Sequence, residues 1–249
     1  MSQISIPQAD LDLLRGYDTP TICNVIEVFN IRPRHSGYLD GRLRACFPEM
    51  PPMVGFASTA TFRSAAPPSQ GGVYASLDRQ VAAFAEGPAP TVVVFQDLDD
   101  PPAAATFGEV MCTTYQRFGA VGLVTSGAAR DLDQVRRLGF PCFSSGVICS
   151  HGYAHFVDLG IPVRAGGVTI QPGDLLHGDA NGVTTIPLEI ASAVAQACAE
   201  YVAAEQVVLD YCKSAQVTPA GFGEARAECG RLIAALGERV RRGRQAGVG

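Results

Sequence analysis

Short apolar segments alternate with amphipathic ones through the middle of the chain. The apolar segments contain small and β-prone residues and predict strands, which fall at 53–62, 90–98, 121–125 and 141–145. The amphipathic segments between them predict helices, which fall at 73–87, 106–118 and 131–138. Gly87 and Gly139 follow two of these helices, where glycine commonly ends a helix. This alternation predicts an α/β fold with a substantially parallel core.

The N-terminal part predicts two more helices, within 7–29. The second begins at the segment DTPTICNVIEVFN, where either Asp18 or Thr19 can cap the helix and Pro20 suits its first position. Residues 31–52 are rich in Pro, Gly and Arg and predict a long structured loop.

The pattern changes after Gly152. Short apolar runs are separated by Gly-Gly, Pro-Gly and Asn-Gly pairs, which predict antiparallel hairpins. The segment GDANGV (178–183) resembles the start of a calcium-binding loop, but the terminal acidic ligand is missing, so a hairpin turn explains it better. Two Ala-rich helices are expected at about 188–215 and 219–242. They are long for packing on one small domain, so we expect them to make oligomer contacts.

Composition limits the class of protein. The chain has 249 residues, of which 47% are hydrophobic and 17% charged, and this predicts a globular domain with a substantial core. We expect a single domain over 1–249, with a core at about 15–200 and a helical extension at about 201–249. The net charge of −5 gives no overall attraction to nucleic acid or to an anionic membrane. A basic run close to the C-terminus is interpreted as a solvated, fraying tail: Arg239, Arg241, Arg242 and Arg244.

The cysteines and the apolar runs concern the cellular compartment. Eight cysteines occur without a CxxC pair, and the first residues contain no secretory apolar region. They are therefore expected to be reduced thiols, mostly in the core. No apolar run approaches the roughly 20 residues that span a bilayer. These features predict a cytoplasmic protein without a membrane partner.

The pair Arg130-Asp131 is the strongest candidate for chemistry. It follows an apolar strand and a Ser126-Gly127 break, so it lies at a strand's carboxyl end, where open α/β sheets bind ligands. Arg can receive a carboxylate, and Asp can hold a divalent cation. Asp131 can equally cap the helix that follows it, with Gln134 completing a capping box. One residue can do both, so the two interpretations stay open.

Two weaker candidates are close in sequence. Gly108-Glu109 opens a predicted helix, and glycine allows the backbone to approach an anion there. Cys149, His151 and His155 are grouped, but a zinc site would need a helix at Gly152 and a fourth ligand. A histidine at a pocket edge, contacting substrate, explains His151 better. The dinucleotide, P-loop, hydrolase and metalloprotease motifs GxGxxG, GK[ST], GxSxG and HExxH do not occur.

Two longer segments resemble one known family. They are GAVGLVTSGAARDLDQVRRLGFPCFSSG and PVRAGGVTIQPGDLLHGDANGVTTIP, and the segment DTPTICNVIE is similar to that family's N-terminal helix. The family contains the 4-hydroxy-4-methyl-2-oxoglutarate and 4-carboxy-4-hydroxy-2-oxoadipate aldolases and the regulator of ribonuclease E activity A. The resemblance covers about 15–200. Its most specific element is Gly108 followed by Arg130-Asp131.

The resemblance implies a compact α/β/β fold, swivelling-domain-like, with mixed sheets and C-terminal helices. It also implies a homotrimer or homohexamer with active sites between subunits. Asp131 would then bind Mg²⁺ or Mn²⁺, and Arg130 would bind the 2-keto acid, with catalytic roles for Arg130, Asp131 and Glu109. The substrate would also contact the backbone from Gly108 through Glu109 and Val110 to Met111, and His151.

The same resemblance implies a reaction. A metal and an arginine would stabilise the pyruvate enolate formed by retro-aldol cleavage or by oxaloacetate decarboxylation. The chain departs from the family at Glu109, where Asp is common, at Ser126, and at Gln134, where an acidic residue is common. A neighbouring subunit's Glu200, Glu205 or Asp210 would then complete the site. The alternative function is that of a non-catalytic regulator that binds a ribonuclease.

Overall fold

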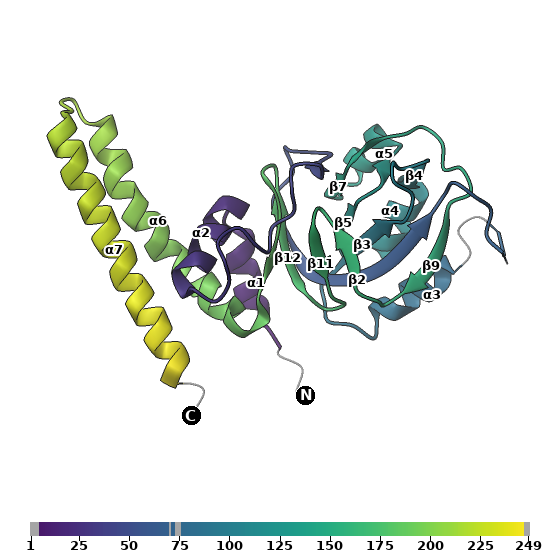
Figure 1. Ribbon diagram of the computed structural model, residues 1–249, viewed down its shortest axis with the longest axis horizontal. Helices are drawn as coiled ribbons and strands as arrows, with labels where there is room; N and C mark the ends of the chain where they lie inside the picture. The colour runs from purple at the N-terminus through teal and green to yellow at the C-terminus, as the bar shows by residue number, and fades with distance from the viewer. Residues whose placement is uncertain (1–4, 70, 73–75, 247–249) are drawn as a thin grey trace.

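A mixed sheet forms the centre of the protein in the computed structural model, which describes residues 5–69, 71–72 and 76–246 (Figure 1). Four strands run parallel in the order β7-β5-β3-β2: Cys142–Ser144, Ala120–Thr125, Thr91–Asp97 and Met53–Arg63. Antiparallel strands extend it on both sides. At one edge, β1 (Arg44–Ala45) pairs with β7. At the other, β12 (Leu175–Asp179) and β9 (His155–Leu159) both pair with β2, and β12 also pairs with β13 (Gly182–Ile186). The predicted α/β fold with a parallel core is confirmed.

Both faces of this sheet are buried. Along β3, Val93 and Phe95 face one hydrophobic cluster, whereas Val92 and Val94 face another. The first cluster is covered by three helices: α3 (Leu77–Phe84), α4 (Glu109–Arg117) and α5 (Leu132–Arg137). The second is covered by the loop around Leu39 and by the hairpin of β10 (Val163–Ala165) and β11 (Val168–Ile170). Burial on both faces explains the continuous apolar run in the sequence of β3.

A second, smaller sheet lies beside the first. Its three strands are short and parallel, in the order β4 (Ala105–Phe107), β6 (Ala128–Ala129) and β8 (Gly146–Val147). The sequence predicts a helix from 106, which is wrong at its start: Thr106 and Phe107 belong to β4, and α4 begins only at Glu109. Thr106 is held in the strand because its hydroxyl donates to the carbonyl of Ala128 (3.1 Å).

The predicted antiparallel hairpins are confirmed. Gly166 and Gly167 connect β10 to β11, and both have positive φ values of 51° and 79°. In the second hairpin, Asp179 is paired with Gly182, and the Asp179 carboxylate accepts the N–H of Asn181 (2.8 Å). The side chain that could have bound calcium is therefore used to close the turn.

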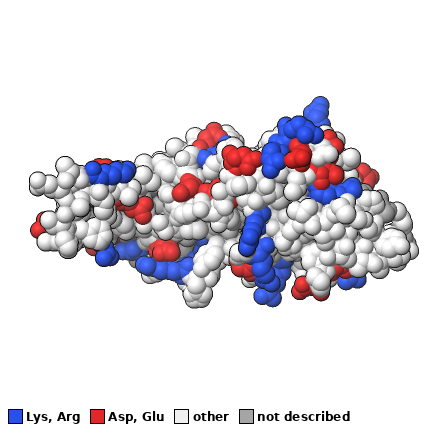
Figure 2. Space-filling view, turned by 90° about the horizontal axis from the view of Figure 1, so that it is seen from above, with Lys and Arg blue, Asp and Glu red and all other residues white. Residues whose placement is uncertain are grey.

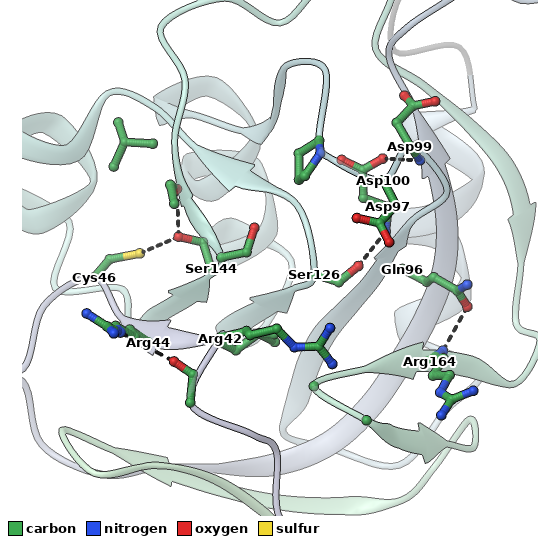
Figure 3. A pocket seen from close by; sticks show the side chains of 18 of the residues that line it. Arg42, Arg44, Cys46, Gln96, Asp97, Asp99, Asp100, Ser126, Ser144 and Arg164 are labelled. Carbon is green, nitrogen blue, oxygen red and sulfur yellow. Dashed lines mark hydrogen bonds between the residues drawn. The ribbon is translucent and has the colours of Figure 1, made fainter.

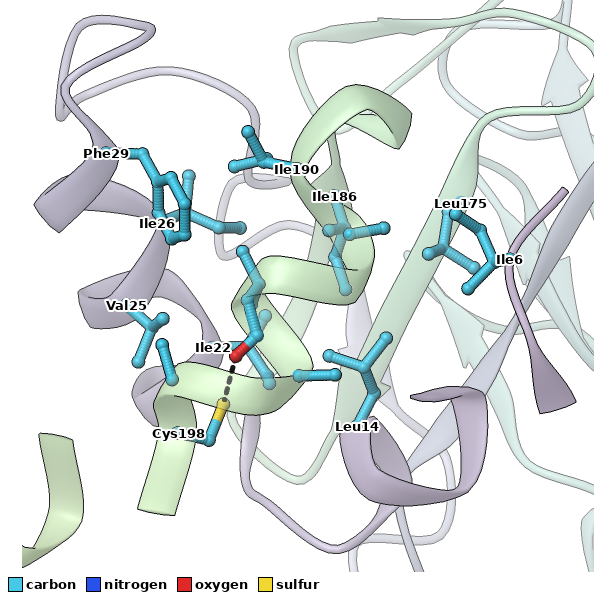
Figure 4. Packing of buried hydrophobic residues seen from close by; sticks show 14 of the residues in the cluster. Ile6, Leu14, Ile22, Val25, Ile26, Phe29, Leu175, Ile186, Ile190 and Cys198 are labelled. Carbon is cyan, nitrogen blue, oxygen red and sulfur yellow. Dashed lines mark hydrogen bonds between the residues drawn. The ribbon is translucent and has the colours of Figure 1, made fainter. Parts of the chain in front are cut away.

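Helices cover the remaining end of the large sheet. Helices α1 (Gln8–Arg15), α2 (Thr19–Phe29) and α6 (Ala191–Lys213) follow closely the segments predicted from sequence, and η1 (Leu188–Ile190) leads into α6. Asp18 caps α2 by accepting the N–H of Thr21 (2.9 Å), which decides between the two candidate caps. Ile22 and Ile26 of α2 pack with Ile186 and Ile190 in a third cluster (Figure 4).

The last helix, α7 (Pro219–Ala246), runs antiparallel beside α6, and the far end of this pair stands away from the sheets (Figure 1). Leu236 anchors α7 in the third cluster. The arginines of the predicted tail are mostly exposed to solvent, as expected, but they lie on this helix, so the predicted fraying is wrong. Arg239 pairs with Glu200, and Arg241 donates to the carbonyl of Val28 (2.8 Å).

Charges are intermixed on the face shown in Figure 2, where acidic and basic side chains alternate over the sheets and the helices. All eight cysteines are free thiols, as expected. No helix within the described residues is long and apolar enough to cross a membrane. The helix predicted at 73–87 is observed as α3 over Leu77–Phe84, and the first part of the prediction, 73–75, lies outside the described residues.

Candidate active site at the carboxyl end of the small sheet

Two neighbouring parallel strands bring the main sequence-predicted residues together. Gly108 and Glu109 directly follow β4, and Arg130 and Asp131 directly follow β6. Because β4 and β6 are parallel, their carboxyl ends lie at the same edge of the small sheet. The N–H of Arg130 donates to the carbonyl of Phe107 (3.2 Å), which continues the pairing up to this edge.

Asp131 joins the two segments through its side chain. Its carboxylate Oδ2 accepts the backbone N–H of Glu109 at 3.0 Å, so it caps the first turn of α4. Asp131 directly precedes α5, but its φ of 54° and ψ of 39° place it in the left-handed region, and its side chain makes no capping hydrogen bond to α5. The predicted capping box with Gln134 is therefore wrong, since an N-cap residue normally has extended backbone.

Gly108 allows this close approach. A Cβ atom at this position would collide with Asp131 Oδ2 and would lie 3.1 Å from both Cγ and Nε of Arg130. The φ of Gly108 is −160°, so its backbone is extended and does not itself require glycine. The requirement is for space between the loop and the Arg-Asp pair.

Arg130 is half-buried beside Asp131. Its Nε lies 3.8 Å from Asp131 Oδ2, and this buried Nε has no hydrogen-bond partner in the described part of the chain. A buried donor of a permanently charged group is costly to leave unpaired. Its weak pairing with Asp131 is therefore the one interaction found for this Nε among the described residues.

The first turn of α4 supplies further donors. Val110 and Met111 follow Glu109, and the first N–H groups of a helix have no acceptor within the helix. The Val110 side chain is exposed, whereas Met111 is buried in the sheet–helix cluster. Backbone N–H groups and the helix dipole here favour a carboxylate.

The acidic groups suit a magnesium ion held mainly through water. Asp131 Oδ2 is occupied by Glu109 N–H, which leaves Oδ1 for a cation, and the Glu109 side chain begins at the same edge. No group of three His, Cys, Asp or Glu residues that could hold a metal is found among the described residues. Mg²⁺ typically takes one or two carboxylates plus water and substrate oxygens, so this donor set fits Mg²⁺ or Mn²⁺ and does not fit a closed zinc site.

The structure places His151 in a different neighbourhood. Ser150, next to it, accepts the N–H of Ala105 (2.8 Å), and Tyr153 donates to Ser64 (3.0 Å). This segment thus lies beside the start of β4, whereas Gly108 follows its end. His155 begins β9 and is not on a helix with His151, so the i, i+4 zinc geometry is absent. A substrate contact by His151 stays a prediction.

Ser126, at one position where the chain departs from the family, and Asp133, next to another, have other partners. Ser126 Oγ accepts the backbone N–H of Asp97 (2.9 Å). Asp133, one position before Gln134, forms an ion pair with Arg136 (2.9 Å). Neither residue is hydrogen-bonded to Asp131.

A larger cavity near this edge was missed by the sequence analysis. It encloses about 1120 Å³ at the carboxyl ends of β3, β5 and β7 (Figure 3). Asp97 lies in its wall and is only 8% exposed. Burial raises the pKa of the Asp97 carboxyl to about 6, although the hydrogen bond from the backbone N–H of Asp99 acts to lower it. The signal in the sequence was the acidic run QDLDD directly after a buried strand.

Comparison with known proteins shows the family. The family model described as Aldolase/RraA, the RraA-like family, matches residues 19–185. The chain therefore belongs to the RraA-like family. Solved structures support the fold: an uncharacterized protein from Pseudomonas syringae matches with a TM-score of 0.70 and 23% identity over 91% of this chain and 97% of that one. RraAS2 of Streptomyces coelicolor, an unusual member of the ribonuclease ES inhibitor RraA family, matches with a TM-score of 0.64 and 23% identity over 81% and 96%.

Curated relatives match over shorter stretches. A protein of Halalkalibacterium halodurans, described provisionally as a 4-hydroxy-4-methyl-2-oxoglutarate aldolase, is 35% identical over 99 residues, which cover 39% of this chain and 47% of that protein. Protein DlpA of Legionella pneumophila is 34% identical over 83 residues, or 32% of this chain and 14% of that protein. The chain thus spans less than half the length of these two relatives.

Proposed function

We propose that this protein is a carbon–carbon lyase, dependent on Mg²⁺ or Mn²⁺, that cleaves a 2-keto acid and releases pyruvate. The observation that carries the proposal is the junction of Arg130, Asp131 and the Gly108-Glu109 loop at one sheet edge. It combines a guanidinium whose Nε has no hydrogen bond in the described part of the chain, a carboxylate and helix N–H groups within one small site. The provisional aldolase description of the relatives agrees with this reaction class.

Binding of the substrate follows from these groups. The guanidinium of Arg130 binds the carboxylate of the 2-keto acid, and the N–H groups of Val110 and Met111 add donors from the helix end. Asp131 and water would hold the metal ion, which supplies a Lewis acid for the keto oxygen when it is bound. Glu109 Oε accepts a proton, directly or through a water molecule that it holds.

The chemical step is a retro-aldol cleavage. The proton of the 4-hydroxyl group passes to the Glu109 carboxylate, the C3–C4 bond breaks, and its electron pair moves onto the pyruvate unit as an enolate. Arg130 offsets the negative charge that develops there. Return of the proton to C3 gives pyruvate, and the other fragment leaves as a carbonyl compound. Oxaloacetate loses CO₂ through the same enolate, so the site is expected to decarboxylate it as well.

An assay of pyruvate release tests this proposal. Purified protein with Mg²⁺ is given 4-hydroxy-4-methyl-2-oxoglutarate or oxaloacetate, and pyruvate is followed with lactate dehydrogenase against a blank without protein. We expect release that stops with EDTA and falls at least about a hundredfold in Arg130→Ala, with Arg137→Ala, an exposed arginine of α5, as the matched control. No release from either compound, or full activity in Arg130→Ala, would reject the proposal and leave the regulator alternative.

A further inference from the structure

The large cavity borders the proposed lyase site. Its wall is formed by the loop 41–46, by the ends of β3, β5 and β7, by the turn between β10 and β11, and by Leu132 and the strand β8. It does not include Gly108–Met111, Arg130 or Asp131. The carboxyl ends of parallel strands are the usual ligand position in an α/β sheet, so this cavity is a second candidate site.

Side chains of opposite charge line this cavity without pairing with each other. Asp97 and Asp100 lie on the loop after β3, and Arg164 lies on β10. None of these three forms an ion pair within the described residues, whereas the neighbouring Asp99 accepts the N–H groups of Ser64 (2.7 Å) and Ala65 (2.9 Å). Asp97, Asp100 and Arg164 thus line the cavity without an ion-pair partner among the described residues.

Arg42 provides a second cation. Its Nε and Nη2 are bound by the carboxylate of Asp40, which leaves Nη1 without a partner in the described structure. Figure 3 shows this side chain directed into the cavity, towards Ser126 and the region below Asp97. The cationic side of the cavity thus offers donors from Arg42 and Arg164.

Hydrogen bonds fix several polar groups of the cavity wall. Gln96 Oε1 accepts the backbone N–H of Arg164 (2.8 Å) and fixes this arginine at the cavity edge. Ser126 Oγ accepts the N–H of Asp97, so the hydroxyl proton of Ser126 can be donated to a ligand atom. Asp97 Oδ1 accepts the N–H of Asp99 (3.0 Å), while its buried Oδ2 has no partner in the described part of the chain.

We propose that this cavity binds a free α-amino acid, with its carboxylate against Arg42 and Arg164 and its ammonium group against Asp97 and Asp100. A simple carboxylic acid would satisfy the arginines but would lie against the aspartates, and a simple amine would do the reverse. Only a ligand with both charges satisfies both sides, and charge-assisted hydrogen bonds are stronger than neutral ones.

Calorimetric titration with three related compounds tests this. L-Norvaline carries both charges, pentanoate lacks the ammonium group, and 2-aminopentane lacks the carboxylate. We expect L-norvaline to bind the intact protein with a Kd at least about tenfold lower than either of the other two compounds. Equal binding of L-norvaline and pentanoate would overturn the proposal.

Variants then locate the site. Asp100 and Arg164 are exposed, so Asp100→Asn and Arg164→Ala are expected to fold normally and to raise the Kd of L-norvaline at least about fivefold. Arg137→Ala, outside the cavity, is the control. Asp131→Asn is expected to bind L-norvaline like the unaltered protein, which separates this site from the lyase site. Unchanged binding in both Asp100→Asn and Arg164→Ala would contradict the proposal.

Discussion

The carboxylate of Asp131 accepts the backbone N–H of Glu109 at 3.0 Å, across 22 residues of sequence. This bond connects the end of β6 to the beginning of α4 and fixes the position of both segments of the proposed lyase site. It also orients the carboxylate, because one oxygen is bound and the other remains for a cation.

Substitution of Gly108 by alanine is expected to displace the Arg-Asp pair. The new methyl group would collide with Asp131 Oδ2 and press on Arg130, since these atoms occupy its space. We expect lyase activity to fall at least about tenfold while far-ultraviolet circular dichroism stays the same. Gly146→Ala, on β8 of the same small sheet, has no atom within 4 Å of its Cβ and serves as the control. Equal activity of the two variants would contradict the packing argument.

Asparagine and alanine at position 131 are expected to differ in stability. Asp131 has a φ of 54°, which asparagine tolerates better than alanine. Asparagine can still accept the Glu109 N–H, whereas alanine leaves it without a partner. We therefore expect Asp131→Ala to lose about 1–3 kcal/mol of unfolding free energy in urea titrations and Asp131→Asn to lose less. Both should lose metal-dependent activity. Equal unfolding free energies for the two variants would show that neither the left-handed backbone at Asp131 nor its cap on α4 contributes to stability.

His177 is expected to make the protein less stable in acid. Its Nδ1 lies 2.9 Å from the Thr19 hydroxyl and its Nε2 lies 3.0 Å from the Leu14 carbonyl, so the buried ring is neutral with the proton on Nε2. Burial lowers the pKa of His177 below its ordinary value of 6.5. The unfolded chain therefore takes up a proton first, and stability present above about pH 6.5 is lost as the pH falls below it.

Urea titrations of the unaltered protein and of His177→Gln at pH 7.5 and 5.5 measure this effect. We expect the unaltered protein to lose more unfolding free energy on acidification, by up to about 1.4 kcal/mol per pH unit. The contributions of other groups are common to both proteins and cancel in the difference. Parallel pH profiles would show that His177 does not titrate differently in the folded state.

Asp97 is expected to make the protein less stable as the pH rises, which is opposite to the effect of His177. Burial raises the pKa of its carboxyl from 3.8 to about 6, so the stability that it contributes is complete below about pH 3.8 and is lost as the pH rises through about 6. The unfolding free energy of Asp97→Asn relative to the unaltered protein should therefore be higher at pH 7.5 than at pH 4.5, by up to about 2 kcal/mol. Asp133→Asn, an exposed position on α5, should show no such gain. A flat difference for Asp97→Asn would show that the carboxyl is solvated.

A substitution at Leu236 tests whether α7 unfolds together with the rest of the protein. It is 1% exposed and packs in the third cluster, with residues of α2 and α6. Leu236→Ala is expected to lose about 2–5 kcal/mol of unfolding free energy and to shift a single unfolding transition of the whole protein to a lower urea concentration. Val217→Ala, an exposed residue between α6 and α7, is the control. Two separate transitions would show that the helical pair unfolds independently.

The periodic segments were predictable from sequence because their burial is repetitive. The alternation of Val92 to Phe95 between two clusters, and the capped start of α2 at Asp18, follow from local pattern. The three-residue strand β4 could not be predicted from local pattern, because a strand that short has too few residues to show a period. Its pairing with β6 is decided by tertiary contacts.

The site residues were predictable as types but not in their contacts. The sequence placed Arg130 and Asp131 after a strand, yet the cap that it allowed for Asp131 was on α5. The carboxylate instead caps α4, and this depends on a left-handed backbone at Asp131 and on the space at Gly108. The acidic run QDLDD marked one wall of the large cavity, but the cavity as a whole was not predictable, because its other walls come from segments that are far apart in sequence.

A crystal soaked with Mn²⁺ and oxalate, an analogue of the pyruvate enolate, shows whether the metal and the substrate bind between Gly108 and Asp131. We expect an anomalous manganese peak beside Asp131, bound directly or through water, with oxalate on the guanidinium of Arg130 and the first turn of α4. Manganese and oxalate bound elsewhere, with the edge between Gly108 and Asp131 empty, would contradict it.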